Sequence, residues 1–181
     1  MNKEQKMRGR AMRNDKKDSN GEKQFGPLLN IEDVLPIINE ISIFAGLSDK
    51  QLYALFRLLK KGSYRAGEKV FEEGTQPSHI YVVQSGSVKL VVNAEQTPLE
   101  LIVFEKGHCF GETSVIGIQP HAATAVCIED TELIVLSRNA LLSLYKSDLA
   151  LFSTLVLNIA REACRRLYKT DEILLHYVQT Q

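Results

Sequence analysis

The feature that most constrains the fold lies between residues 62 and 137, where short apolar runs alternate with regularly placed glycines. These glycines are Gly67, Gly74, Gly86, Gly107 and Gly111. The runs between them are too short for helices and are rich in β-branched residues, which is typical of strands ended by turns. Seven or eight short strands at this spacing predict a sandwich, barrel or roll.

Strands are expected at residues 80–83, 88–92, 99–104, 122–128 and 133–136. The first and last of these runs are apolar at every position or nearly so, which indicates strands enclosed between two layers. In the second run, Val88, Leu90 and Val92 recur with a period of two and are predicted to share one face.

The flanking segments have helical spacing. Apolar residues every three or four positions between residues 31 and 59 predict two short helices, the second capped by Asp49. Ser137 is predicted to cap a further helix. After Asp148 a helical pattern continues to the C-terminus without proline or glycine. A helix of that length outruns a small domain, so part of its apolar stripe needs a partner, although Arg166 and Thr170 interrupt the stripe.

The chain is therefore divided into four parts. Residues 1–24 are predicted to form a disordered basic tail, with eight Lys and Arg against four Asp and Glu. Residues 25–61 form an N-terminal helical segment, residues 62–137 the β-roll, and residues 138–181 a hinge helix followed by the long C-terminal helix.

Composition narrows the class of function. The chain has 44% hydrophobic and 24% charged residues and no formal net charge, which favours neither nucleic acid nor a membrane surface. Three widely spaced cysteines predict no disulfide framework and a cytoplasmic location. The four histidines lack metal-ligand spacing, so no metal or cofactor is expected. Ser114, Glu112 and His121 lie close in sequence, but no nucleophile-elbow pattern surrounds Ser114, so we expect no enzymatic activity.

Four motifs point to one family: VFEEG at 70–74, IYVVQSG at 80–86, FGETS at 110–114 and PHAAT at 120–124. Together with the order of helices and strands, they resemble the cyclic nucleotide-binding domain family, which includes the bacterial catabolite-activator sensors. The resemblance covers residues 40 to 178. It implies a double-stranded β-helix, or jelly-roll-like β-roll, of about eight strands with N-terminal helices and a long C-terminal helix. The last two motifs, residues 110–124, resemble the phosphate-binding cassette of that family and are called the cassette below.

The resemblance assigns roles within the cassette. Gly111 allows a tight turn, and the amides of Glu112, Thr113 and Ser114 meet the phosphate. In the family, the carboxylate at the position of Glu112 accepts a hydrogen bond from the ribose 2′-hydroxyl. An arginine then pairs with the phosphate. Here that position is His121, followed by Ala122 and Ala123.

Three alternatives follow from His121. A neutral imidazole has one donor and no fixed charge, whereas arginine has a planar fork. In the first alternative, a phosphate favours imidazolium, and a cyclic nucleotide binds more tightly as pH falls from 8 to 6. In the second, the site binds another small anion. In the third, the roll is a degenerate scaffold that acts by dimerisation or protein docking.

The resemblance also bears on the ligand and the partners. Family sites that prefer cGMP often have threonine after the arginine; Ala122 at this position favours cAMP. Alignment on Arg165 and Arg166 places Thr170 and Asp171 where the catabolite activators contact adenine. We expect a sensor of a cyclic nucleotide, a homodimer formed through the C-terminal helix, no membrane association, and no reading of DNA sequence, because only three residues follow Val178.

Overall fold

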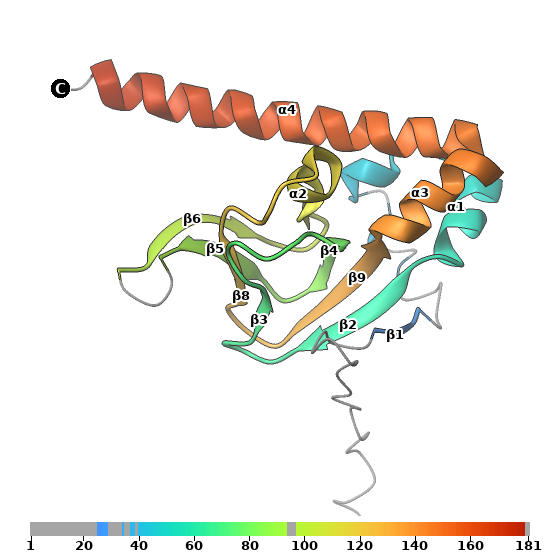
Figure 1. The fold of residues 1–181 in the computed structure, drawn as a ribbon, viewed down its shortest axis with the longest axis horizontal. Coiled ribbons are helices and arrows are strands. Elements are labelled where there is room, and N and C mark those ends of the chain that lie inside the picture. The colour runs from blue at the N-terminus through green and yellow to red at the C-terminus, as the bar shows by residue number, and fades with distance from the viewer. Residues whose placement is uncertain (1–24, 29–33, 35–36, 39, 94–96, 180–181) are drawn as a thin grey trace, which may run out of the picture.

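Two antiparallel sheets form the body of the molecule (Figure 1). The computed structural model describes residues 25–28, 34, 37–38, 40–93 and 97–179; the predicted tail of residues 1–24 lies outside them. The first sheet has the strand order β1-β2-β9-β4-β7 and the second β3-β8-β5-β6. The strands are β1 (Gly26–Pro27), β2 (Lys60–Tyr64), β3 (Lys69–Phe71), β4 (His79–Ser85), β5 (Val88–Val92), β6 (Leu99–Phe104), β7 (Cys109–Phe110), β8 (Thr124–Cys127) and β9 (Thr131–Ser137). The predicted fold class, mainly β with flanking helices, is confirmed.

The two central strands of the first sheet have apolar residues on both faces because a core lies on each side of them. One core fills the space between the sheets and includes Val83, Phe110 and Leu133. The other lies between the first sheet and the helices and includes Ile80 and Ile134. The neighbouring residues Ile80 and Tyr81, or Leu133 and Ile134, therefore contribute to different cores, as the continuous apolar runs in β4 and β9 predict.

The turn between β4 and β5 requires glycine. Gly86 has a φ of 83°, and a Cβ atom there would lie 2.5 Å from the Thr131 hydroxyl oxygen and 2.6 Å from the Asp130 carbonyl oxygen. Any other residue would meet both a strained backbone and these atoms of the next strand connection. The sequence motif at residues 80–86 thus ends in a glycine that both the backbone and the packing require.

Val88 and Leu90 of β5 contact the same inner core, as the period of two predicts. The pairing of β5 with β6 shifts register between Leu90 and Val91, where β6 has one extra residue, Leu101. Val88 and Val91 are buried, while Leu90 and Val92 are partly covered. A bulge of this kind adds one residue to one strand and reverses the alternation beyond it. On β6, an edge strand of the second sheet, Leu99 and Leu101 are exposed and Phe104 is buried.

The helices flank the roll on one side and at one end (Figure 1). They are η4 (Ser42–Phe44), α1 (Asp49–Phe56), α2 (Glu112–Gly117), α3 (Arg138–Ser147) and α4 (Leu149–Gln179). The N-cap of α1 is Ser48 and not Asp49 as predicted, because Gln51 completes a capping box with the Ser48 side chain. Much of the other N-terminal helix expected lies outside the described residues, and residues 42–44 form a 3₁₀ turn.

The C-terminal helices agree with the prediction in position. Ser137 caps α3 by accepting a hydrogen bond from the Ala140 amide, and α4 then continues without a break. Figure 1 shows α4 crossing the whole roll above α2 and extending past its edge. The N-terminal half of α4 buries Leu151, Leu155 and Ile159 against the helical core. No helix among the described residues is both long and apolar enough to cross a membrane.

Candidate ligand-binding site

The cassette begins at a backbone turn between β7 and α2. Gly111 is the N-cap of α2 and has a φ of 81°, and a Cβ atom there would lie 3.0 Å from the His79 carbonyl oxygen and 3.2 Å from the Tyr81 ring. Only glycine accommodates this conformation without strain. The turn directs the chain from the inner core to the surface below α4, and the residue that follows, Glu112, is the first of the helix.

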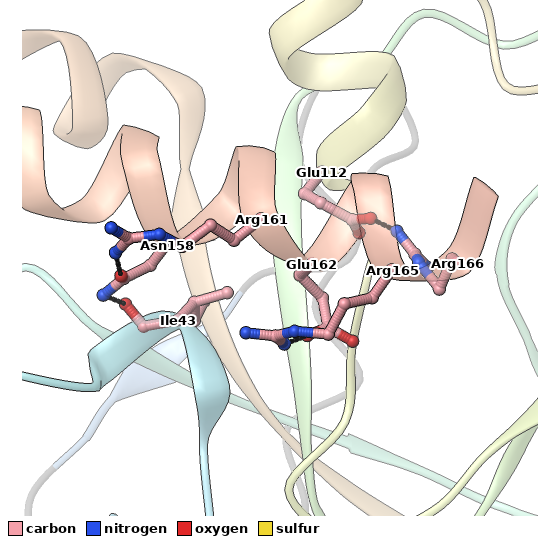
Figure 2. Close-up of polar contacts among 7 residues, drawn as sticks. All are labelled: Ile43, Glu112, Asn158, Arg161, Glu162, Arg165 and Arg166. Carbon is pink, nitrogen blue, oxygen red and sulfur yellow. Dashed lines mark hydrogen bonds and ion pairs between the residues drawn. The ribbon is translucent and has the colours of Figure 1, made fainter. Parts of the chain in front are cut away.

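Glu112 is the most unusual residue of the site. Its side chain has 0% exposure, although it is a carboxylate in a loop-to-helix connection. It forms an ion pair with Arg166 of α4, and Figure 2 shows the two side chains pointing toward one another. Outside this ion pair, its carboxylate oxygens accept no hydrogen bond from the described residues. Buried carboxylates normally have several hydrogen-bond donors, so Glu112 has acceptor capacity that the protein leaves unused.

Arg166 closes the site from above. Its side chain retains 24% exposure, and its guanidinium carbon lies 5.6 Å from the centre of the Phe104 ring. Burial lowers the pKa of Arg166. Burial also raises the pKa of the nearby Cys109 thiol to about 12, and the Arg166 charge acts in the opposite direction. The guanidinium therefore lies over an apolar and aromatic floor made by the ends of β6 and β7.

His121 is held in the second cassette motif by stacking and by its backbone. Its ring lies 3.7 Å from the Phe71 ring at an interplanar angle of 9°. Its amide donates to the Thr75 carbonyl oxygen at 2.9 Å, and its carbonyl oxygen accepts from the Gly74 amide at 2.8 Å. The side chain is buried, and this burial lowers the pKa of His121. The imidazole is therefore neutral at ordinary pH.

A row of rings separates His121 from Arg166. Phe71, which stacks on His121, lies 6.0 Å from Phe110, and Phe110 stacks on Phe104 at 5.3 Å. Arg166 covers the far end of the row. The cassette thus has a neutral histidine at one end and a paired arginine at the other, with aromatic side chains between them.

The remaining predicted site residues are distributed over the same region. Thr113 and Ala122 are exposed, Ser114 is partly buried and Ala123 is buried. Thr170 and Asp171 are exposed on α4, one turn beyond Arg166, and the Thr170 hydroxyl donates to the Arg166 carbonyl oxygen at 2.9 Å. The structure thus brings Glu112 to α4, while Thr170 and Asp171 lie on its exposed surface.

Two polar residues of α4 were not predicted as site residues. In the sequence analysis, Arg166 served to align the helix with the catabolite activators and was interpreted as an interruption of the apolar stripe. Asn158 is buried in the same helix, and its amide donates to the carbonyl oxygens of Ile43 at 3.2 Å and Ala45 at 2.8 Å. Arg161 in turn donates to the Asn158 side-chain oxygen (Figure 2). The sequence feature that could have identified Asn158 and Arg166 is the presence of a polar residue within an apolar helical pattern.

The described residues contain no group of three or more His, Cys, Asp or Glu side chains arranged to hold a metal ion.

Comparison with known proteins defines the class. The fold matches a crystal structure of a cyclic nucleotide-binding domain from Methylobacillus flagellatus with a TM-score of 0.71 and 21% identity, covering 81% of this chain and 83% of that one. Residues 61–148 match the family model of the cyclic nucleotide-binding domain. The chain therefore carries a domain of the cyclic nucleotide-binding family, as its sequence motifs predict.

The individual relatives come from several branches of the family. The chain is 29% identical over 132 residues to the cyclic AMP receptor protein of Thermus thermophilus, covering 71% of this chain and 58% of that protein. A crystal structure of the catabolite activator protein of that species matches with a TM-score of 0.66 and 28% identity, covering 76% of this chain and 63% of the other. A cGMP-dependent protein kinase of Plasmodium berghei is 31% identical over 90 residues, which are 50% of this chain and 10% of the kinase.

Proposed function

We propose that this chain is a sensor domain that binds a cyclic nucleotide between the β-roll and α4, with cAMP preferred over cGMP. The observation that carries the proposal is Glu112, a fully buried carboxylate at the start of the cassette helix with unused acceptor capacity. Burying a charge is costly, so a site that retains one has a use for it. A ribose 2′-hydroxyl is the donor that the family places at this position.

The other cassette residues have the roles that the family resemblance implies. Gly111 and the amides of Glu112 to Ser114 face the phosphate, with His121 as a neutral neighbour. Ala122 and Ala123 follow without a threonine to recognise guanine, and this supports cAMP. Thr170 and Asp171 are one helical turn beyond Arg166, where α4 approaches the base.

Ligand binding at Glu112 is proposed to change the contacts of α4 directly. Since Arg166 forms the ion pair with Glu112, a ribose hydroxyl that binds Glu112 changes the partner of an α4 side chain. Ligand binding then competes with the Glu112–Arg166 ion pair, which holds α4 on the roll. The position of α4 therefore depends on whether the site contains the ligand. We infer a regulatory and not a catalytic role, and a cytoplasmic location, which the three free cysteines support.

Isothermal titration calorimetry with cAMP and cGMP tests the proposal. The wild-type protein is expected to bind cAMP in the micromolar range and cGMP more weakly. Glu112→Gln removes the charge that accepts from the ribose and is expected to weaken cAMP binding roughly tenfold to a hundredfold. Glu105→Gln, at an exposed position after β6, is the matched control and leaves the affinity unchanged. Absence of binding by both nucleotides would reject the proposal.

The exposed residues of α4 support a homodimer. Seven exposed positions follow alternating steps of three and four residues and are called the outer seam: Leu157, Ala160, Cys164, Leu167, Asp171, Leu174 and Val178. This spacing is that of a two-stranded coiled coil. Arg166 and Thr170, which interrupt the apolar stripe predicted from the sequence, are not members of this seam. We propose that a second copy binds along this seam.

Cys164 provides a direct test of the dimer. In a parallel pair of helices in register, residues at the same seam position face each other, so Cys164 lies opposite its counterpart in the second copy. Cys109 and Cys127 are buried. Mild oxidation is therefore expected to produce one covalent dimer on non-reducing gels, and Cys164→Ser is expected to abolish it. A monomeric mass by light scattering together with no covalent dimer contradicts the seam.

The alternative function is a scaffold that acts through protein contacts, or a site for a different small anion. The observation in its favour is that Glu112 and Arg166 neutralise each other without a ligand. The variant His121→Arg separates these possibilities, because it restores the arginine of the family cassette. A large gain in cAMP affinity supports a functional cyclic-nucleotide site, whereas no cAMP binding by this variant favours the scaffold. Competition of inorganic phosphate for the same site would identify a general anion site.

A further inference from the structure

The segment of residues 25–28 brings an aromatic side chain onto the roll. Phe25 directly precedes β1, which pairs with β2 at the edge of the first sheet (Figure 1). The Phe25 side chain is partly buried and packs against the core between the two sheets. Leu28, at the other end of the segment, packs against the helical core. The segment therefore contacts both cores of the molecule.

The roll provides a close-fitting place for the Phe25 ring. A Cβ atom at Gly62 of β2 would lie 3.1 Å from two atoms of this ring and 3.1 Å from the Tyr64 ring. The His79 ring meets the Phe25 ring edge to face at 4.9 Å, and the Tyr81 ring lies 6.3 Å away at an angle of 68°. Gly62, Tyr64, His79 and Tyr81 are called the Phe25 seat below. Because residue 62 lacks a side chain, the ring has the space that it occupies.

Two residues of the Phe25 seat also contact the cassette turn. A Cβ atom at Gly111 would lie 3.0 Å from the His79 carbonyl oxygen and 3.2 Å from the Tyr81 ring. The backbone at Gly111 therefore packs directly on both residues, and neither can shift toward it without a clash. His79 and Tyr81 thus contact both Phe25 and the residue that begins the cassette helix.

The Tyr81 ring also reaches the second cassette motif through other rings. It stacks on Phe110 with ring centroids 5.2 Å apart and an interplanar angle of 17°, and it lies 5.9 Å from Phe71. Phe71 in turn stacks on His121. Since the rings are closely packed, a change in the position of Tyr81 affects residues of both cassette motifs.

His79 reports on whether the Phe25 ring is in its seat. The Nδ1 atom of His79 lies 2.7 Å from the Ser78 hydroxyl oxygen. Burial lowers the pKa of His79 from 6.5 to about 4, and Lys60 is the charged residue that acts in the same direction. Loss of the Phe25 ring exposes the imidazole to water, so the pKa of His79 is expected to rise toward 6.5.

We propose that Phe25 positions the cassette turn through His79 and Tyr81, so that docking of residues 25–28 and ligand binding at the cassette favour each other. The inference rests on the proposed function, because the ligand in question is the proposed cyclic nucleotide. Coupling of this kind is reciprocal: the docked segment raises the ligand affinity by the factor by which the ligand favours docking. Phe25 is therefore a positioning residue for the site.

The first experiment is calorimetry of cAMP with wild type, Phe25→Ala, Phe25→Tyr and the control Leu28→Ala. Phe25→Ala is expected to weaken cAMP binding by about fivefold to tenfold, at the lower end of the usual coupling between sites. Phe25→Tyr keeps the ring and behaves as wild type. Leu28→Ala removes a contact of the same segment with the other core and leaves the affinity unchanged. Circular dichroism checks that each variant is folded.

Gly62→Ala tests the seat while Phe25 is still present. The added methyl group displaces the Phe25 ring, so this variant is expected to weaken cAMP binding as Phe25→Ala does. The double variant is expected to bind no more weakly than Phe25→Ala, because the displaced ring is already absent. The pKa of His79, measured by NMR titration without ligand, is expected to rise in both single variants and not in Leu28→Ala.

Limited proteolysis with chymotrypsin measures the reverse effect of the ligand on the segment. Phe25 is the first aromatic residue of the chain, and chymotrypsin cleaves after it only when the ring leaves its seat. Saturating cAMP is expected to slow this cleavage by the same factor by which Phe25→Ala weakens binding. Cleavage after Tyr53, an exposed residue of α1, is the control for a general gain in stability.

The outcomes separate the inference from the proposed function. An unchanged cAMP affinity in Phe25→Ala, with the His79 pKa raised, overturns the inference, while the proposed function stands. An equal loss of affinity in Leu28→Ala also overturns it, because the effect then follows from general destabilisation. Absence of cAMP binding by the wild type and by His121→Arg rejects the proposed function, and the inference with it.

Discussion

Burial sets the protonation state of two histidines near the cassette. His79 lies at the start of β4, with its ring 4.9 Å from the Phe25 ring and its Nδ1 atom 2.7 Å from the Ser78 hydroxyl oxygen. Burial lowers the pKa of His79 from its ordinary 6.5 to about 4, and the neighbouring Lys60 acts in the same direction. The pKa of His121 is lowered for the same main reason. Both side chains are neutral in the folded protein near pH 7.

This depression of the His79 pKa predicts lower stability in acid. The unfolded chain binds a proton near pH 6.5 and the folded chain only near pH 4. The stabilising contribution of neutral His79 to the free energy of unfolding is therefore fully present above pH 6.5 and decreases as pH falls toward 4. The urea midpoint is expected to be lower at pH 5 than at pH 7, and His79→Phe is expected to reduce that difference. His176→Gln, at an exposed position on α4, is the control. An unchanged pH dependence in His79→Phe would contradict this explanation.

The pH dependence of ligand binding tests whether His121 becomes protonated when the phosphate binds. A histidine that becomes protonated when the phosphate binds makes the affinity rise as pH falls from 8 to 6. Burial lowers the pKa of His121 from its ordinary value. The cAMP affinity is therefore expected to be nearly constant between pH 6 and pH 8. Calorimetry in buffers of matched ionic strength measures it, and a tenfold gain at pH 6 would assign the charge to His121.

At the scale of elements, polar side chains of α4 contact two other elements among the described residues. Asn158 donates to the carbonyl oxygens of Ile43 in η4 and of Ala45 just after it, and Arg166 pairs with Glu112 of α2. The outer seam lies on exposed positions of the same helix. A change at Glu112 therefore acts on an element that also presents the proposed dimer surface, which is how occupancy of the site would reach a second copy.

Removal of the Asn158 contact tests how firmly the N-terminal half of α4 is held. Asn158→Leu leaves two carbonyl oxygens of the turn without a donor and is expected to lower the free energy of unfolding by about 1–3 kcal/mol. Thr154→Ala, one turn earlier and with a hydroxyl that bonds only to its own helix, is expected to change it little. Chemical denaturation measures both variants. A loss no greater for Asn158→Leu than for Thr154→Ala would show that the contact adds no stability.

The cassette and the strands were accessible from sequence because their signals are local. Glycine before Glu112 and the period of two in the apolar runs both depend on neighbouring residues. The bulge in β6 was not accessible, because the extra residue Leu101 is defined by the pairing with β5 and not by any pattern in its own strand. The partner of Glu112 was missed for a related reason. A helical wheel indicates which residues of α4 share a face, but not that Arg166 faces α2.

The prediction of Asp49 instead of Ser48 as the N-cap of α1 was also wrong because it used local sequence alone. Both residue types are good N-caps, and the sequence alone does not fix which of two adjacent residues is the last before the helix. The capping box with Gln51 decides in favour of Ser48. Within the site, the stacking of His121 on Phe71 also required the structure, since β3 and the second cassette motif are far apart in sequence.

At the scale of the whole molecule, the domain is a roll whose cassette is covered by its own C-terminal helix. The buried Glu112 connects the two, since it begins the cassette helix and pairs with α4. The central claim is that this carboxylate accepts the 2′-hydroxyl of a cyclic nucleotide. A comparison of cAMP with 2′-deoxy-cAMP tests that contact with the protein unchanged.

The measurement is calorimetric titration of the wild-type protein with the two ligands in the same buffer. Loss of one hydrogen bond to a charged acceptor is expected to weaken the deoxy ligand by about 1.5–3 kcal/mol, or roughly tenfold to a hundredfold. That result would place the ribose on Glu112 beneath α4. Equal affinities for cAMP and 2′-deoxy-cAMP, or binding of neither, would contradict the account.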